Sequence, residues 1–174
     1  GRTIGVVTDE VGAPLEVVDE EGNVTRYRTG PLGLPLEVSH PDGRTDTMQY
    51  DARLRLTEFR EGSARVAQME YNGPFGEVTL ERDARTRVTT FEYDEQGNLT
   101  ARVDRLNRRK EWEYDGQGKL TSIVDEAGER TTFAYDQNGN LETKTDPTGV
   151  VTRFARDTAG RVANVTYGDG TADA

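Results

Sequence analysis

The chain has 174 residues, a formal net charge of −10 and no cysteine. Its length is that of one domain, but 33% hydrophobic residues, 31% charged residues and 19 glycines exclude a large packed core. The charge disfavours nucleic acid and anionic membranes as partners, the lack of cysteine excludes disulfides and thiol chemistry, and no apolar run reaches the ~20 residues needed to span a bilayer.

A sequence period of 21 residues runs through the whole chain. Each repeat contains two Asp-x-x-Gly turns or their variants: a first turn, as in Asp94–Gly97, and a second turn, as in Asp104–Asn107. One extra residue lies between Leu54 and Gly76. We divide the chain into a repeat tail, 1–5, and eight repeats: 6–26, 27–47, 48–69, 70–90, 91–111, 112–132, 133–153 and 154–174. Because the chain starts within a repeat and without Met, we expect it to be a piece of a longer protein.

The residue types in each turn indicate an antiparallel β-meander. The Asp carboxylate accepts a hydrogen bond from the backbone NH two residues on, and Gly adopts positive φ without a Cβ clash. Two turns per repeat, about ten residues apart, leave two strands of roughly five to seven residues. No window has a helical period, so we predict an all-β fold with two strands per repeat.

The first four repeats deviate most from this pattern. In the first two, the apolar positions after the first turn shift by one residue, behind Pro14 and Pro35, which indicates a local bulge or twist. In the third, Leu54 replaces the first-turn glycine, so we expect that turn to be disrupted; Ala64 occupies the second-turn glycine position. In the fourth, the turn Gly73-Pro74-Phe75-Gly76 places an aromatic residue at its tip, which we interpret as drift in a tolerant loop rather than a partner contact.

The last four repeats define the faces of the sheet. Alternation predicts Trp112 and Tyr114 on one face, with Glu111 and Glu113 on the other. On the second strand of each repeat we expect two alternating sets, each sharing a face: Leu99, Ala101 and Val103, and Leu120, Ser122 and Val124. The aromatic positions form a ladder, which favours a sheet that coils so that this face lines a cavity. The ladder residues are Tyr27, Met48, Phe91, Trp112, Phe133 and Phe154, and, two positions later, Tyr50, Tyr93, Tyr114 and Tyr135.

The motif that carries a family resemblance is Tyr-Asp-x-x-Gly-x-Leu. It occurs at Tyr93–Leu99, Tyr114–Leu120 and Tyr135–Leu141, with Asp146-Pro147-x-Gly149 downstream. These runs resemble the YD repeats of the Rhs family, which includes bacterial polymorphic toxins, the C component of insecticidal toxin complexes, wall-associated toxins and animal teneurins. The resemblance covers essentially the whole chain and is strongest over 91–153.

The resemblance implies a long β-sheet wound into a hollow shell, which in bacterial members encloses a C-terminal toxin until delivery. It also implies a secreted or extracellular destination. The implied partners are neighbouring repeats of the parent protein, the enclosed toxin domain and secretion-apparatus proteins. Self-processing members close the array with a distinct segment after a DPxG sequence. Here Asp146–Gly149 is followed by another ordinary repeat, so we expect any protease and toxin to lie outside this chain.

No catalytic, cofactor-binding or metal-binding residue is predicted. The acidic clusters at Asp19–Glu21 and Asp125–Glu126 lack the spacing of a calcium loop, and turn formation already explains them. His40, the one histidine, takes the Asp position of a second turn, where we interpret it as a turn variant rather than a base or metal ligand.

The function that we predict is a non-catalytic section of a toxin-enclosing shell, with no cofactor. The alternative is an extracellular carbohydrate-binding or adhesive array in which aromatic residues stack on sugar rings. An enzyme is the third and least favoured class. We also expect the isolated chain to self-associate through edge strands or the aromatic face.

Overall fold

The computed structural model describes residues 5–10, 12–168 and 172–173. Within these residues the protein is all-β, as predicted, with 17 strands and one short 3-10 helix, η1 (Pro31–Gly33). The chain divides into two compact units: the first comprises Gly1–Tyr71 and Val78–Val88, and the second Asn72–Glu77 and Thr89–Ala174.

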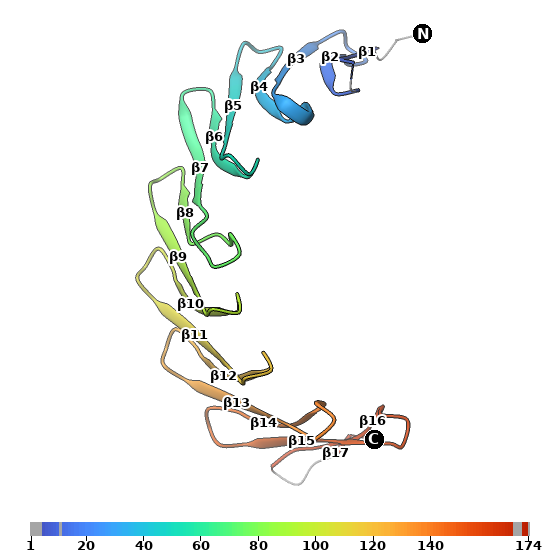
Figure 1. The fold of residues 1–174 in the computed structure, drawn as a ribbon, viewed down its shortest axis with the longest axis vertical. Helices are drawn as coiled ribbons and strands as arrows, with labels where there is room; N and C mark the ends of the chain where they lie inside the picture. Colours follow the sequence, from blue (N-terminus) through green and yellow to red (C-terminus); the bar gives the residue numbers. More distant parts are fainter. Residues whose placement is uncertain (1–4, 11, 169–171, 174) are drawn as a thin grey trace. The chain divides into compact units, whose positions relative to one another are not determined.

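Each unit is an antiparallel meander in which a strand pairs with the one before it and the one after it (Figure 1). The first unit contains β1 (Gly5–Thr8), β2 (Pro14–Val18), β3 (Val24–Thr29), β4 (Pro35–Ser39), β5 (Thr45–Tyr50), β6 (Leu56–Glu61), β7 (Ala64–Glu70) and β8 (Leu80–Asp83). From Thr89 onward the second unit contains β9 (Val88–Tyr93), β10 (Leu99–Val103), β11 (Arg109–Tyr114), β12 (Leu120–Val124), β13 (Arg130–Tyr135), β14 (Leu141–Thr145), β15 (Val151–Arg156), β16 (Val162–Thr166) and β17 (Ala172–Asp173).

A β-bulge follows the first turn of every repeat except the fourth, whose hairpin of β7 and β8 has a continuous register, and the bulge changes which side chains share a face. In the hairpin of β11 and β12, Tyr114 pairs with Leu120 but Glu113 pairs with Ser122, so Thr121 is an extra residue. Side chains opposite one another share a face. Leu120 therefore lies with Tyr114, whereas Ser122 lies with Glu113 on the other face. The prediction that Leu120, Ser122 and Val124 share a face was wrong, because the apolar pattern does not mark the bulge.

The same bulge bears on two further predictions, of which one was wrong and one is confirmed. On β10, Leu99 pairs with Tyr93 but Ala101 pairs with Glu92, so Leu99, Ala101 and Val103 do not share a face either. The predicted bulges after Pro14 and Pro35 are confirmed. They are not peculiar to those repeats, however, since later first-turn hairpins carry the same irregularity.

Leu54 does not disrupt its turn, contrary to the prediction. It adopts the left-handed conformation, with φ of 63°. Its NH donates to the carbonyl of Asp51 at 3.0 Å, and the Asp51 NH donates to the carbonyl of Arg55 at 3.0 Å, as in the glycine turns. The remaining turn bonds thus hold a leucine in a conformation that normally requires glycine. Thr86 and Asn107 do the same in second turns, each with φ of 61°.

Ala64 is not a turn residue, and that assignment was wrong. It is the first residue of β7 and pairs directly with Glu61, the last residue of β6, across the two-residue turn Gly62–Ser63. Gly62 takes the positive φ, at 57°. Glu61 occupies the position that the turn aspartate has in other repeats. Gly62, immediately after it, permits a tighter hairpin.

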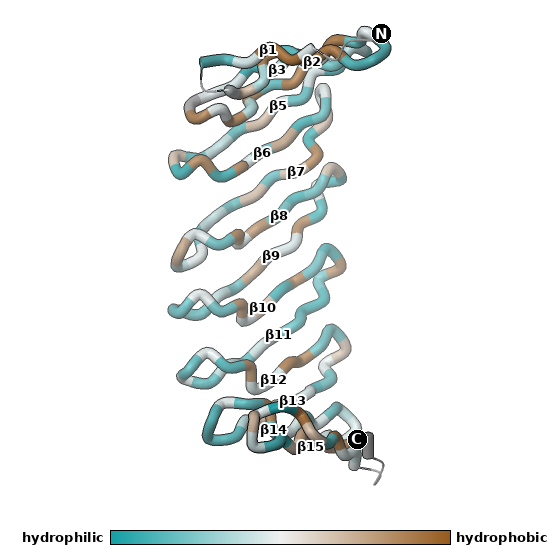
Figure 2. The backbone as a smooth tube through the Cα atoms, turned by 90° about the vertical axis from the view of Figure 1, so that its right-hand side faces the viewer, coloured by the Kyte–Doolittle hydropathy of each residue, from teal (hydrophilic) through white to brown (hydrophobic). Residues whose placement is uncertain are grey.

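The interior is thin, in agreement with the composition. Among the described residues the one fully buried hydrophobic side chain is Ala101, and the buried polar side chains are Asp46, Glu58, Asp104 and Ser122. In the second unit, Figure 2 shows mostly hydrophilic turns at the ends of hairpins whose strands carry the hydrophobic residues. Stability therefore depends on hydrogen bonds and ion pairs as well as on apolar burial.

Candidate functional site

The turn aspartates each organise their own loop. One carboxylate oxygen, Oδ1, accepts hydrogen bonds from the backbone NH groups two and four residues on; at Asp115 these come from Gln117 and Lys119, both at 2.9 Å. The bond from the second residue was predicted, but the bond from the fourth was not. Among the described turns the pair of bonds occurs at Asp19, Asp51, Asp83, Asp94, Asp104, Asp115, Asp125, Asp136, Asp146 and Asp157.

The second carboxylate oxygen, Oδ2, is often bound by the side chain four residues on. Asparagine donates its amide, as from Asn98 to Asp94 at 2.9 Å, and arginine donates Nε, as from Arg108 to Asp104 at 2.8 Å. The Arg108 hydrogen bonds lower the pKa of Asp104 to about 2. A recurrent Asn or Arg directly after the turn glycine position was the sequence signal for this contact.

The tyrosine of the repeat motif joins one repeat to the repeat before it. Its hydroxyl donates to the carbonyl of the residue 15 positions earlier, the first residue of a strand in the preceding repeat. The sequence prediction placed Tyr50, Tyr114 and Tyr135 in a packing ladder, and it missed this bond because the bond depends on register. The bonds are Tyr50 to Pro35 at 2.9 Å, Tyr71 to Leu56 at 2.7 Å, Tyr114 to Leu99 at 3.0 Å and Tyr135 to Leu120 at 2.8 Å.

Three clefts lie beside successive first turns in the second unit. Their volumes are about 410, 660 and 520 Å³ in chain order. Carboxamides and turn aspartates line all three, and aromatic rings line the second and third. The first includes Gln96, Asn98, Asp115 and Gln117; the second Asp115, Lys119, Phe133, Tyr135 and Gln137; the third Asn138, Asn140, Glu142, Phe154 and Arg156.

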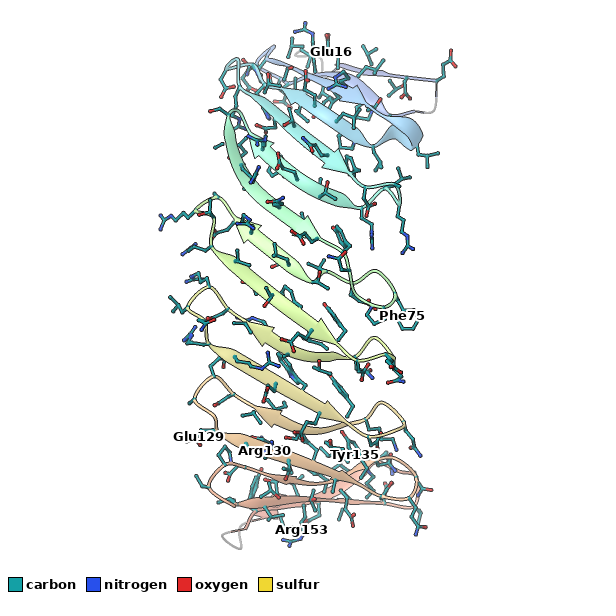
Figure 3. The ribbon with its side chains drawn as sticks, turned by 60° about the vertical axis from the view of Figure 1, so that its left-hand side comes forward. Glu16, Phe75, Glu129, Arg130, Tyr135 and Arg153 are labelled. Carbon is teal, nitrogen blue, oxygen red and sulfur yellow. The ribbon has the colours of Figure 1, made fainter. Side chains whose placement is uncertain are left out.

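The face opposite the aromatic ladder carries ion pairs that cross a whole strand. Arg130 on β13 donates from Nη1 to Ser122 on β12 at 2.6 Å and to Glu113 on β11 at 2.8 Å. Figure 3 shows Arg130 and Tyr135 at opposite ends of β13. Ser122 is 2% exposed, and its small side chain leaves room for the guanidinium above it. Arg130 and Glu113 therefore neutralise each other.

His40 retains the backbone of a turn, as predicted. Its NH donates to the carbonyl of Arg44 at 2.8 Å, and the Gly43 NH donates to the carbonyl of His40 at 3.0 Å. The side chain has a contact that was not predicted: Nε2 lies 2.6 Å from Oδ2 of the buried Asp46, whose Oδ1 is 3.3 Å from Nε of Arg44. The imidazole thus pairs with a buried carboxylate of the same hairpin.

Phe75 lies at the tip of its turn and is 71% exposed. Its NH donates to Oε2 of Glu77 at 2.9 Å. The ring contacts the turn at Gly97, where a Cβ atom would lie 2.8 Å from the ring and 2.9 Å from Glu77. The tip is therefore fixed by its neighbours, and Figure 3 shows Phe75 projecting from the edge of the sheet.

The turn aspartates, the tyrosine hydroxyls and the ion-paired side chains contact their neighbours rather than converging on a common point. Within the described part of the chain, no group of three or more His, Asp or Glu side chains is placed to hold a metal ion. None of the helices found there is long and apolar enough to cross a membrane.

Comparison with known proteins matches the chain to one family model, the RHS repeat. The matched segments are residues 71–109, 114–150 and 135–172, which together cover more than half of the chain. They begin in the fourth repeat and include the three Tyr-Asp motifs at Tyr93, Tyr114 and Tyr135.

Two relatives come from different kingdoms of life. The double-stranded DNA deaminase toxin A of Burkholderia cenocepacia (strain H111) is 30% identical over 99 residues, which are 57% of this chain and 7% of that protein. Teneurin-4 of Mus musculus is 27% identical over 89 residues, which are 51% of this chain and 3% of that protein. The chain thus spans less than a tenth of the length of these relatives.

A solved structure with a similar fold is the crystal structure of TcdB2-TccC3. It aligns with 97% of this chain and 12% of its own chain, with a TM-score of 0.52 and 14% sequence identity. At this level of identity the similarity concerns the fold.

Proposed function

The chain belongs to the RHS-repeat family, and from this premise we propose that it is a non-catalytic section of a coiled β-sheet shell that encloses a C-terminal toxin and helps to deliver it. The observation that carries the proposal is that the recurring polar residues have structural partners. The turn aspartates bind their own loops, and the tyrosine hydroxyls bind the preceding repeat. The chain accordingly has the properties of a structural section of a β-sheet shell.

The relatives support the toxin part of this proposal. One is named as a DNA deaminase toxin, and the chain matches only 7% of it. The described residues contain no cluster placed to hold a metal ion, which fits a protein whose chemistry is performed by another domain. We therefore assign no catalytic, cofactor or metal residue to this chain, and we infer that the enclosed toxin and neighbouring repeats of the parent are its partners.

A secreted destination and contact with secretion-apparatus proteins complete the proposal. A relative named as a toxin and a teneurin support a destination outside the cell. The division into eight repeats from residue 6 to residue 174 also remains a proposal, as does self-association of the isolated chain through its edges.

Limited proteolysis of the full-length parent protein tests the enclosure. We expect the C-terminal domain to resist protease in the intact protein and to become sensitive when residues 112–132, one whole repeat, are deleted. Replacing those residues by the sequence of 133–153 is the matched control, because it keeps the number of repeats constant. A parent without a downstream toxin domain, or a domain that is equally protected in the deletion variant, would refute the proposal.

The clefts beside the first turns favour a second candidate function, binding of neutral carbohydrate. Carboxamides and carboxylates, with Phe133 and Tyr135 at the second cleft, are groups that hydrogen-bond to and stack against sugar rings. The net charge of −10 disfavours polyanionic glycans. A glycan array probed with the chain and with a Gln117→Ala/Gln137→Ala variant tests this function. Binding that the two substitutions do not reduce would exclude the first and second clefts, which these residues line.

A further inference from the structure

Successive hairpins in the second unit pair at one end only. The ladder between β10 and β11 joins Ala101 to Glu111 and ends at Val103 and Arg109, next to the second turn. The ladders between β12 and β13 and between β14 and β15 have the same three-residue extent. Within a hairpin, by contrast, pairing continues up to the first turn, as between Tyr114 and Leu120. The first-turn ends of neighbouring hairpins are therefore spread apart.

The motif tyrosine lies where the two hairpins separate. Tyr114 is the last residue of β11, and its hydroxyl reaches the carbonyl of Leu99, the first residue of β10, at 3.0 Å. Tyr135 makes the equivalent bond to Leu120 and lines the cleft between its own turn and the turn of the preceding repeat. The Tyr135 ring thus lines the space that a continued backbone ladder would close.

We propose that the motif tyrosine is a spacer that sets the angle between successive repeats. The ring keeps the first-turn ends apart, and its hydroxyl bond to the preceding strand fixes that separation. Adjacent paired strands lie ~4.8 Å apart, so a hairpin held open at one end and paired at the other is rotated relative to its neighbour. In repeat proteins a small rotation per repeat accumulates into the curvature of the array.

Two further observations agree with a ring held between hairpins. Burial raises the pKa of the Tyr50 and Tyr114 hydroxyls. In addition, the bond spans the same 15 residues at Tyr50, Tyr71, Tyr114 and Tyr135. That constancy holds although the accepting residue is proline in one case and leucine in the other three. The tyrosine hydroxyl therefore recognises the backbone carbonyl and not the side chain of the accepting residue, as a general spacer requires.

The last repeat provides a natural contrast. Arg156 stands in the tyrosine position, and its Nη1 donates to the carbonyl of Gly160 in its own turn at 3.0 Å. The side chain here organises its own hairpin instead of reaching back to Leu141. The inference concerns how the repeats are joined, and it holds whether or not the parent protein encloses a toxin.

Distance measurements between spin labels on the full 174-residue chain test the spacer. The chain has no cysteine, so Gln96→Cys and Gln117→Cys label two equivalent first-turn tips one repeat apart. Arg105→Cys and Glu126→Cys label the corresponding second-turn tips as the matched control. The distances are compared in chains carrying Tyr114, Tyr114→Phe or Tyr114→Ala.

We expect Tyr114→Ala to shift the first-turn distance downward, toward the ~10 Å of two strand spacings, and to leave the second-turn distance unchanged. Tyr114→Phe keeps the ring, so it should retain the mean distance with a broader distribution. An unchanged first-turn distance in Tyr114→Ala overturns the proposal, and so does an equal shortening in Tyr114→Phe. If Tyr114→Ala does not fold, as judged by loss of the second-turn distance, Tyr114→Leu replaces it; it should shorten the distance partly, and no shortening again overturns the proposal.

Discussion

The guanidinium of Arg109 reaches across an entire strand to the carboxylate of Glu92. Two hydrogen bonds of 2.6 and 2.8 Å join them, one from each terminal nitrogen. The strand between them presents Ala101, which pairs with Glu92 on one side and Glu111 on the other and is fully buried. The ion pair therefore requires a small side chain in the middle strand, because a larger one would occupy the space of the guanidinium.

Enlarging Ala101 should break this arrangement. We expect Ala101→Leu to lower the free energy of unfolding by about 1–3 kcal/mol, because the larger side chain must displace Arg109 from Glu92 or strain the strands around it. Urea unfolding followed by circular dichroism measures the change. Ala134→Leu is the control, because Ala134 is exposed and the substitution should change stability by no more than about 0.5 kcal/mol. Equal effects at the two sites would contradict the argument.

The turn at Leu54 should be improvable. A left-handed conformation costs a leucine about 1–2 kcal/mol, part of which is offset because glycine loses more chain entropy on folding. Leu54→Gly should therefore raise the free energy of unfolding by about 0.5–1 kcal/mol, measured as a higher urea midpoint. Asn107→Gly is the comparison: Asn tolerates this conformation, so the gain should be smaller. A loss of stability in Leu54→Gly would show that the side chain contributes packing that outweighs the strain.

Restoring tyrosine in the last repeat should add an inter-repeat bond. Nε of Arg156 is buried without a hydrogen-bond partner, whereas a tyrosine at this position is placed to donate to the carbonyl of Leu141. We expect Arg156→Tyr to raise the free energy of unfolding by about 0.5–1.5 kcal/mol, the usual net value of one hydrogen bond. Arg156→Phe adds the ring without the hydroxyl. An equal rise in the free energy of unfolding in both variants would show that the hydroxyl contributes nothing.

Acid should destabilise the fold through the turn aspartates. Hydrogen bonds lower the pKa of Asp104 to about 2, and the pKa values of Asp94 and Asp136 are also lowered. A carboxyl group with a lower pKa in the folded state stabilises that state fully above its unfolded pKa near 3.9. This stabilisation is lost as the pH falls through the folded pKa. The urea midpoint should therefore decrease between about pH 4 and pH 2.

Substitution isolates the contribution of one turn to this acid response. Asp104→Asn should lower stability at pH 7 and flatten the decrease between pH 4 and pH 2. An Asp104→Asn variant with the same pH dependence as the parent chain would contradict this assignment.

The repeat pattern predicted the strands and most turns because Asp and Gly act locally. An Asp-x-x-Gly sequence closes its own loop whatever surrounds it. The features that sequence reasoning missed depend on register. The extra residue at Thr121, the bond from Tyr114 to Leu99 and the passage of Arg109 over Ala101 are defined only once neighbouring strands are aligned. The turn at Leu54 was missed for a different reason, since the other turn bonds outweigh the preference of one residue.

The clefts could not be predicted from the sequence for the same reason. They form where pairing between hairpins stops, and Tyr114 at the end of β11 can be related to that point only once the strands are aligned. Their lining was visible in part, because Gln96, Gln117 and Gln137 lie in or next to predicted first turns. The sequence therefore contains the residues that line the clefts, but it does not show the separation of the hairpins that forms them.

The turn aspartate has a consequence for how such arrays arise. The bonds to its Oδ1 atom come from residues at most four positions on, as from Lys119 to Asp115, so a hairpin can close while the chain that follows is still being synthesised. Contacts this local favour fast folding. Each repeat also contains the residues that form its own turns. A whole repeat can therefore be duplicated or lost without substitutions in the neighbouring repeats. An array of this kind can lengthen during evolution by copying 21 residues at a time.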